Sequence, residues 1–259
     1  MSQKAWGPLT LLLLILLAGC AVWIARSADS ADIRWQWGVV LAIILGLCVL
    51  AGFLVNGRPE GILIDDRNRM SLERVQWVAW LIVLLSAYFV EAVWNVAHSF
   101  SFPAMQTELF GLLGIVSGSP VVSNLIVDAK KRTPPSPTAA QEVQAVQPLA
   151  GADAPGQKGL MDLNHSVTEA SWADLYLGEE AANRYVVDVS RLQKLIITVL
   201  LVFAYVVYLW KTFAPPSSDE VAAAAAALGM PPVGTDFLGL LGVSHGAYLA
   251  SKATPKTPS

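Results

Sequence analysis

Charged residues are scarce in this sequence. Asp, Glu, Lys and Arg make up 14% of its 259 residues, whereas 54% of the residues are hydrophobic. A soluble globular domain carries about 25% charged residues, so this balance argues against a soluble domain. It is typical of an integral membrane protein, and the first partner that we expect is the lipid bilayer.

Cysteines and recognisable catalytic motifs are also scarce. The two cysteines, Cys20 and Cys48, fall at different depths of two hydrophobic runs, which argues against a disulfide and favours two buried thiols. Asp65 and Asp66 lack a third metal ligand at a useful spacing. No nucleophile motif, phosphate-binding loop, zinc spacing or redox pair occurs. We therefore expect a protein that is not an enzyme, with no cofactor, no metal and no nucleic-acid partner.

Long hydrophobic runs, in contrast, are abundant. A bilayer core about 30 Å thick requires about 20 mostly apolar residues per helix. Five runs meet this length, and a sixth is shorter and less hydrophobic. They span 8–25, 37–55, 75–97, 107–127, 192–213 and, for the sixth, 235–251. The sequence thus predicts an all-α membrane protein with six transmembrane helices, arranged as three hairpins.

The first run contains a stretch, Leu17 to Cys20, that resembles a bacterial lipoprotein processing site. Cleavage there would remove the first helix. The apolar run continues through Ile24, however, at the place where a lipoprotein would begin a polar tether. We therefore expect the first helix to be retained.

The basic residues predict how the chain is threaded, because the cytoplasmic flanks of membrane helices collect Lys and Arg. If the N-terminus is cytoplasmic, all but three of the 17 basic residues fall on the cytoplasmic side, the exceptions being Arg26, Arg34 and Lys211. Tryptophans prefer the headgroup level, and Trp77 and Trp210 fall at the inner and outer boundaries of this arrangement. We expect both termini in the cytoplasm and a location in the bacterial inner membrane.

The predicted organisation has six parts. They are an N-terminal transmembrane hairpin (1–56), a cytosolic loop (57–74), a first repeat hairpin (75–127), a cytosolic linker with a short amphipathic helix (128–191), a second repeat hairpin (192–251) and a cytosolic tail (252–259).

The long inner loop has two halves of different composition. Its first half is rich in Pro, Ala, Gln and Gly, which favours a flexible linker. In its second half, Ser166 and Glu169 have the spacing of a capping box, which predicts a short helix on the membrane surface or against a partner. We expect residues 161–190 to be the part that meets a cytosolic protein. An alanine-rich helix is predicted separately, in the outer loop at 219–228.

Two segments of the chain resemble each other. SLERVQ, residues 71–76, aligns with DVSRLQ, residues 188–193, and each precedes a hydrophobic run followed by a returning run that contains Gly-Leu-Leu-Gly. Because start, return and order agree, the pattern favours an internal duplication that relates the last two hairpins. Chance resemblance between membrane helices of low complexity is the alternative.

The returning runs carry glycines at aligned positions. Small residues four apart leave a groove in which another helix can approach closely, and such packing is a main source of helix association in lipid. The predicted packing residues are Gly111, Gly114, Gly118, Gly239, Gly242 and Gly246. We expect a homo-oligomer, and the sequence leaves open whether these faces meet within one subunit or between subunits.

Each repeat begins at an Arg-x-Gln corner, Arg74 with Gln76 and Arg191 with Gln193. A cation in the first turn opposes the helix dipole by about 0.3–1 kcal/mol. Either the arginines extend to lipid phosphates, or they pair with acids of the inner loops. The candidate acids are Asp65, Asp66, Glu179 and Glu180.

Polar groups inside membrane helices are costly, and they are therefore functional candidates. Glu91, Asn95 and His98 fall at i, i+4 and i+7, on one helical face. The other candidates are Asn124, His245 and Tyr248. These groups either make structural hydrogen bonds between helices or line a polar path.

Two functions fit these patterns. The first is a non-catalytic membrane scaffold or assembly module that self-associates through its glycine-rich helices and presents a cytosolic loop to a partner. The second is a homo-oligomeric ion channel or permease with a polar path at Glu91 and His245. We favour the first, because a permease usually shows broken helices or more polar residues within the membrane.

Overall fold

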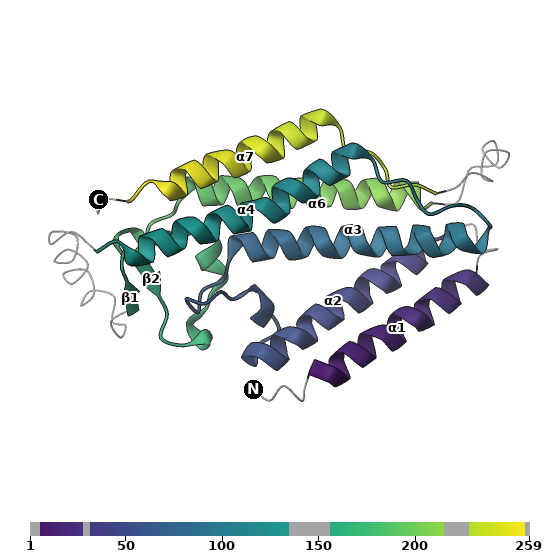
Figure 1. The fold of residues 1–259 in the computed structure, drawn as a ribbon, viewed down its shortest axis with the longest axis horizontal. Helices are drawn as coiled ribbons and strands as arrows, with labels where there is room; N and C mark the ends of the chain where they lie inside the picture. The colour runs from purple at the N-terminus through teal and green to yellow at the C-terminus, as the bar shows by residue number, and fades with distance from the viewer. Residues whose placement is uncertain (1–5, 28–31, 135–155, 215–227, 257–259) are drawn as a thin grey trace. The chain divides into compact units, whose positions relative to one another are not determined.

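The computed structural model describes residues 6–27, 32–134, 156–214 and 228–256 of the chain. Six α-helices lie among these residues (Figure 1). They are α1 (Trp6–Arg26), α2 (Arg34–Asn56), α3 (Leu72–Ala97), α4 (Thr107–Arg132), α6 (Val189–Thr212) and α7 (Thr235–Ala253). The prediction of a mainly helical protein is confirmed.

Four of the helices, α2, α3, α4 and α6, are long and apolar enough to cross a membrane. The described part of α1 contains a shorter apolar stretch, Leu14–Arg26. α7, which contains three glycines, is not one of the four. The helices support the class of protein that the composition predicts, a membrane protein.

The helices belong to two compact units. The first unit consists of Met1–Ile62, Val78–Gly111 and Leu200–Thr235, and the second consists of Leu63–Trp77, Leu112–Val199 and Asp236–Ser259. α3, α4 and α6 contribute residues to both units, and each unit is described below by itself.

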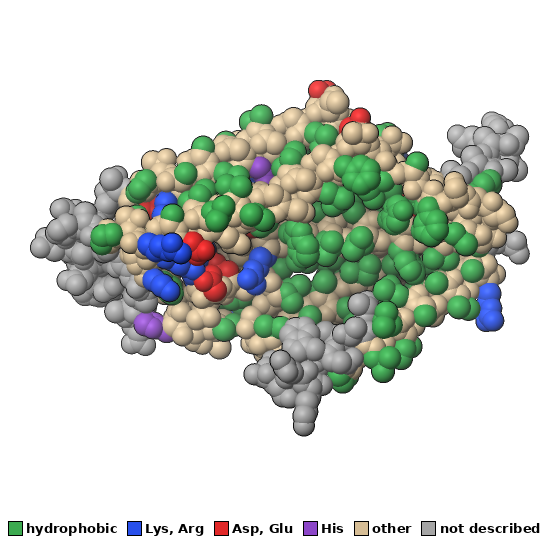
Figure 2. Space-filling model, viewed as in Figure 1, with side chains coloured by type: hydrophobic (Ala, Val, Ile, Leu, Met, Phe, Trp, Pro, Cys, Tyr) green, Lys and Arg blue, Asp and Glu red, His purple; other side chains and the backbone are tan. Residues whose placement is uncertain are grey.

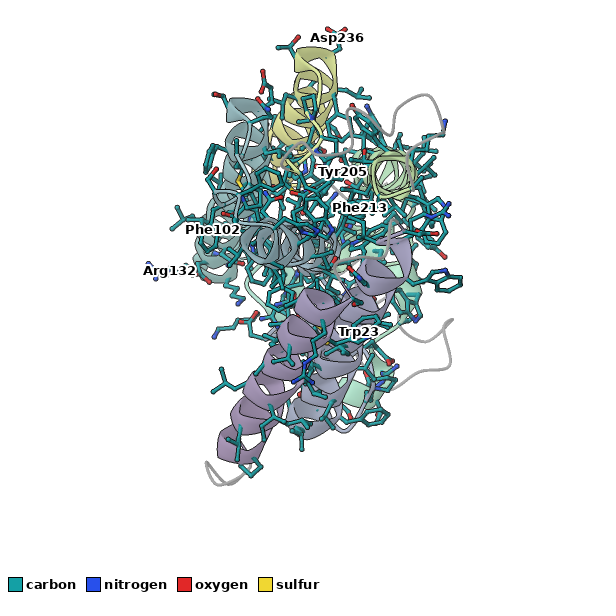
Figure 3. All side chains as sticks on the ribbon, turned by 90° about the vertical axis from the view of Figure 1, so that its right-hand side faces the viewer. Trp23, Phe102, Arg132, Tyr205, Phe213 and Asp236 are labelled. Carbon is teal, nitrogen blue, oxygen red and sulfur yellow. The ribbon has the colours of Figure 1, made fainter. Side chains whose placement is uncertain are left out.

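Aromatic side chains form the core of the first unit, where α1 also packs against α2. Trp37 of α2 donates a hydrogen bond to Ser86 Oγ of α3 (2.9 Å), and its ring centroid lies 5.5 Å from that of Phe213. Trp80 of α3 packs against Tyr205, with centroids 6.0 Å apart. Tyr205 and Phe213, within and directly after α6, are both buried (Figure 3). The two cysteines of this unit, in α1 and α2, are free thiols, as expected.

In the second unit, α3 and α6 begin in similar ways. Ser71 Oγ accepts a hydrogen bond from the backbone N–H of Arg74 (3.4 Å), and Asp188 Oδ1 accepts one from the backbone N–H of Arg191 (3.3 Å). The chain reaches α3 through the short helix η2 (Gly61–Leu63) and a tight turn that is closed by an isolated bridge between Ile64 and Met70.

The inner loop folds differently from its prediction. β1 (Gly156–Lys158) and β2 (Met161–Leu163) form an antiparallel hairpin. Three short 3-10 helices follow, η4 (Val167–Glu169), η5 (Trp172–Leu175) and η6 (Ala181–Asn183). We refer to residues 156–191 as the inner cap.

The short helix predicted in this loop is replaced by a series of short 3-10 segments. Ser166 accepts a hydrogen bond from the N–H of Thr168, and only five residues later Ser171 forms a complete capping box with Asp174. A new N-cap stops each helical segment after about one turn, since N-cap residues adopt extended backbone angles. Most of the predicted linker, residues 135–155, and nearly all of the predicted alanine-rich helix at 219–228 lie outside the described residues.

A small apolar core joins the inner cap to the start of α3. Its buried members come from two segments about one hundred residues apart: Ile64, Met70 and Leu72, and Ala170 and Leu175. The cap is thus packed against the second unit by apolar contacts as well as by the charges described next.

Candidate functional site

Glu179 of the inner cap is the centre of a buried charge cluster in the second unit. Its carboxylate oxygens lie 2.8 Å from Arg67 Nη2, 2.7 Å from Arg191 Nη1 and 2.6 Å from Lys252 Nζ. Burial raises the pKa of Glu179, but the positive charges of Arg191, Lys252 and Arg67 outweigh burial and hold this pKa well below its usual value. Glu179 therefore stays ionised and joins the loop before α3, the start of α6 and the end of α7.

Glu73, in the first turn of α3, forms a second centre next to the first. Its Oε1 accepts hydrogen bonds from Ser123 Oγ (2.6 Å), from Lys252 Nζ (3.1 Å) and from the Tyr248 hydroxyl. Because Lys252 contacts both glutamates, the two centres form one network. This network connects α3, α4 and α7 to the inner cap.

Further ion pairs tie the inner cap to its neighbours. Arg69 Nη1 lies 2.9 Å from Asp162 Oδ2, and the other oxygen of Asp162 lies 2.7 Å from Arg184 Nη1. Lys130, in the last turn of α4, lies 2.6 Å from Glu180 Oε1. Moving the cap away would leave these buried charges without partners, which is costly. The ion pairs therefore favour one position of the cap.

A buried lysine extends the cluster into the helices. Lys194 of α6 is fully buried, donates a hydrogen bond to Ser119 Oγ (3.2 Å) and lies 4.0 Å from the centroid of the Tyr248 ring. Nearby on α7, Ser244 and His245 are buried, and their side chains have no hydrogen-bond partner among the described residues.

A cleft of about 300 Å³ opens beside this network. Its wall is formed by the loop before α3 together with the first turn of α3, by the C-terminal half of α4 and by Lys252 of α7, and it contains four acids and four bases. They are Asp65, Asp66, Glu73 and Asp128, and Arg67, Arg74, Lys131 and Lys252. Figure 2 shows acidic and basic side chains gathered where α4 ends and α3 begins.

Two acids of the cleft are largely exposed. The side chains of Asp66 and Asp128 are 70% and 60% exposed, and both lie near Lys131 Nζ. Burial raises the pKa of Asp66, but the hydrogen bond and the charge of Lys131 outweigh burial and lower it. The cleft therefore presents ionised carboxylates at its edge and ammonium and guanidinium groups beside them.

The two predicted Arg-x-Gln corners have different surroundings. Arg191 pairs with Glu179, one of the acids proposed for it, whereas Arg74 is exposed and donates a hydrogen bond to the Ile64 carbonyl (2.7 Å). Gln76 is buried and donates to Thr198 Oγ1, and Gln193 is exposed.

The predicted polar face of α3 belongs to the first unit. Asn95 exchanges two hydrogen bonds of 2.8 Å with the backbone of Leu228, and the His98 ring stacks on Trp94 at a centroid distance of 3.8 Å. Glu91 is fully buried, and neither of its carboxyl oxygens has a hydrogen-bond partner among the described residues.

Of the other predicted polar residues, His245 and Tyr248 lie beside the charge network of the second unit, and the exposed Asn124 lines the cleft. Sequence reasoning missed Glu73, Lys194 and Lys252. Glu73 gave no signal, because an acid in the first turn of a helix is common. Lys194 lies three residues after Arg191, and this i, i+3 spacing places two cations on one helical face.

The predicted glycine-rich faces are open. A side chain added at Gly114, Gly118, Gly239 or Gly246 would meet no atom within 4 Å, and one at Gly242 would meet only Ile115 Cδ1, at 3.8 Å. Gly111 is exposed. The five predicted glycines from Gly114 to Gly246 therefore make no close helix packing among the described residues.

Comparison of the chain with protein-family models, curated proteins and solved structures finds no match. The long apolar helices are consistent with a membrane protein, and its second unit contains a buried charge network and an open, charged cleft.

Proposed function

We propose that the protein is a non-catalytic scaffold or assembly module of the bacterial inner membrane, which self-associates and presents the inner cap to a cytosolic partner. The observation that carries this proposal is the contact of Glu179 with three cations from three separate segments. A loop that served only as a connection would need no such fixed position. A rigid cap is what a recognition surface requires, because preorganisation lowers the entropic cost of binding.

The exposed surface of the cap supports a role in recognition. Three large side chains of the cap are exposed: Trp172 (56%), Tyr185 (52%) and Val186 (50%). Aromatic residues are usually the anchors of protein interfaces, so their exposure here indicates a binding surface. The proposed partner surface is this part of the predicted 161–190 region.

The proposed topology has six membrane helices in three hairpins, with both termini in the cytoplasm. The similar caps at Ser71 and Asp188 support the duplication of the last two hairpins. The four long apolar helices support the membrane location.

Self-association is supported by the open glycines of α4 and α7. Since a side chain at Gly118 or Gly246 meets nothing within 4 Å, a larger residue there leaves the fold of the chain intact. Any effect of such a residue on assembly then reports on contact between copies.

The test is the mass of the purified full chain in mild detergent, measured by light scattering after size-exclusion chromatography. We expect Gly118→Leu and Gly246→Leu to lower the assembled fraction. Gly46→Leu in α2 is the matched control, because Gly46 is equally open. If all three variants match the wild type, the glycine-rich helices do not carry the association.

One observation favours conduction as a second candidate. Glu91 is a fully buried carboxyl without a hydrogen-bond partner among the described residues, and such a group in a membrane helix is a typical part of an ion path. In reconstituted vesicles, a conducting protein would show proton or cation flux that Glu91→Gln changes and Glu108→Gln, a control in the same unit, does not. Absence of flux from the wild type under an imposed gradient excludes this candidate.

A further inference from the structure

In a chain that crosses the membrane at α3, the charged cleft of the second unit would lie at the depth of lipid headgroups. Trp77 of α3 is 41% exposed, and it falls where an interfacial tryptophan is expected. Glu73 and Arg74 precede Trp77 by one helical turn, or about 6 Å of rise on the cytoplasmic side. The hydrogen bond from Ser123 to Glu73 places this part of α4 at the same level. The headgroup zone begins at the edge of the hydrocarbon and extends about 5–8 Å from it.

The cleft is also continuous with the apolar surface of α4. Val121, Asn124, Leu125 and Asp128 follow the i, i+3, i+4, i+7 spacing of one helical face, and all four are exposed. Val121 and Leu125 are apolar and 60% and 66% exposed, whereas Asn124 and Asp128 line the cleft. A molecule that lies on this face meets apolar side chains and the charged cleft together.

The charges at the edge of the cleft are of both signs. Asp66 and Asp128 are the most exposed acids and both lie near Lys131 Nζ, and Arg74 also lines the cleft. A purely anionic ligand would be attracted by the bases and repelled by the acids. A ligand that carries a phosphate and a primary ammonium group satisfies both sets, because the phosphate accepts hydrogen bonds from the bases and the ammonium donates them to the carboxylates.

We infer that this cleft binds the headgroup of a phosphatidylethanolamine-type lipid, which enters sideways from the inner leaflet. The acyl chains lie on the exposed face at Val121 and Leu125, the phosphate lies near Arg74 and Lys131, and the ammonium lies near Asp66 and Asp128. A choline headgroup fits less well, since its quaternary nitrogen has no N–H to donate. A glycerol headgroup fits less well because it lacks the positive charge.

The experiment is native mass spectrometry of the purified full chain, equilibrated with equal amounts of phosphatidylethanolamine, phosphatidylcholine and phosphatidylglycerol that share the same acyl chains. We expect the wild type to retain the ethanolamine lipid in preference to both others. In the double variant Asp66→Asn, Asp128→Asn, its preference over the choline lipid should fall about fivefold or more, as loss of charge-assisted hydrogen bonds implies. Arg74→Gln should weaken retention of all three lipids.

Glu169→Gln is the matched control, because Glu169 is an exposed acid of the inner cap that does not line the cleft. Its lipid preference should equal that of the wild type. The inference is overturned by equal retention of the three lipids in the wild type, or by an equal change in control and cleft variants. Displacement of the lipid by millimolar soluble phosphoethanolamine would assign the site to a free metabolite and overturn the lipid assignment.

This test is independent of the proposed assembly role. The cleft variants change exposed residues away from the glycines themselves, since Asp128 follows Gly118 on the same face of α4 by ten residues, or about 15 Å of rise. Their assembled fraction should therefore equal that of the wild type. Loss of lipid preference with unchanged assembly therefore concerns the cleft alone.

Discussion

At the scale of single residues, the stability of the second unit depends on buried charged side chains that each contact several partners of opposite charge. Glu179 faces three cations, and Lys252 faces both Glu179 and Glu73. Taking a charge out of water costs several kcal/mol, and only close partners offset this cost. Loss of a buried residue with several charged partners should therefore lower the free energy of unfolding more than loss of an isolated surface pair, which contributes about 0–1 kcal/mol.

Glu179→Gln should destabilise the protein by about 3–5 kcal/mol, because Arg67, Arg191 and Lys252 would remain buried without their common anion. Denaturant unfolding of the detergent-solubilised chain measures this change. Glu169→Gln, at an exposed position of the same cap, should stay within about 0.5 kcal/mol of the wild type. Equal stability of the two variants would show that the cluster does not hold the cap.

The same carboxylate predicts a dependence on pH. The pKa of Glu179 is lower in the folded state than its unfolded value of about 4.3. Its contribution to stability is therefore fully present above pH 4.3 and is lost as the pH falls through the folded pKa. We expect the difference in unfolding free energy between the wild type and Glu179→Gln to be constant from pH 7 to about pH 5 and to shrink below about pH 4. A difference that grows on acidification would contradict this assignment.

At the scale of elements, the end of α2 is held by a close backbone approach. Gly57 ends the helix with a φ of 70°, and its N–H donates to the Phe53 carbonyl. The chain then folds back so that a side chain at Gly52 would lie 2.5 Å from the Pro59 carbonyl oxygen and 2.8 Å from the Gly61 nitrogen. Only glycine fits between helix and turn here.

Gly52→Ala should therefore destabilise the first unit by about 1–3 kcal/mol, since backbone rather than a flexible side chain must move. Gly46→Ala lies in the same helix and meets open space. That change should be neutral or should stabilise the helix by up to about 1 kcal/mol, because alanine has the higher helix propensity. Thermal unfolding of the two variants side by side gives the comparison. A neutral Gly52→Ala would mean that the turn does not pack on α2 as described.

The elements also show what a single sequence can predict. α2, α3, α4 and α6 follow from local apolar runs. The inner cap does not, because its structure depends on pairs far apart in the chain. Arg67 and Glu179, for example, are separated by 112 residues. Local caps at Ser166 and Ser171 indicated helical starts, but nothing local indicated how soon each segment ends.

The candidate site, too, could be predicted from the sequence only in part. The pairing of Arg191 with an inner-loop acid was one of two alternatives that the sequence left open, because a cation in the first turn of a helix opposes the helix dipole. The cleft was not predictable, since its walls come from three separate segments of the chain. Glu91 was a candidate from its position within an apolar run alone, and its side chain is fully buried in the structure.

At the scale of the whole molecule, the described charges are distributed unevenly between the two units. Glu91 is the only buried Asp, Glu, Lys or Arg of the described residues in the first unit, whereas the second unit buries a network of both signs. The second unit also contains the inner cap and the last turns of α4 and α7, with their lysines. This distribution supports a threading in which the second unit includes the cytoplasmic ends of the helices.

The threading predicts which exposed residues a membrane-impermeant thiol reagent can reach. Ser101, in the connection between α3 and α4, should lie outside the cytoplasm, and Thr168 of the inner cap should lie within it; both are exposed. In a variant with Cys20 and Cys48 replaced by alanine, Ser101→Cys should be labelled in intact spheroplasts, and Thr168→Cys should be labelled only after lysis. Labelling of both after lysis shows that each cysteine is reactive, so a failure in intact cells reports location rather than burial. The reverse pattern would place both termini outside the cytoplasm and would assign the inner cap to the opposite side of the membrane, where no cytosolic partner could reach it.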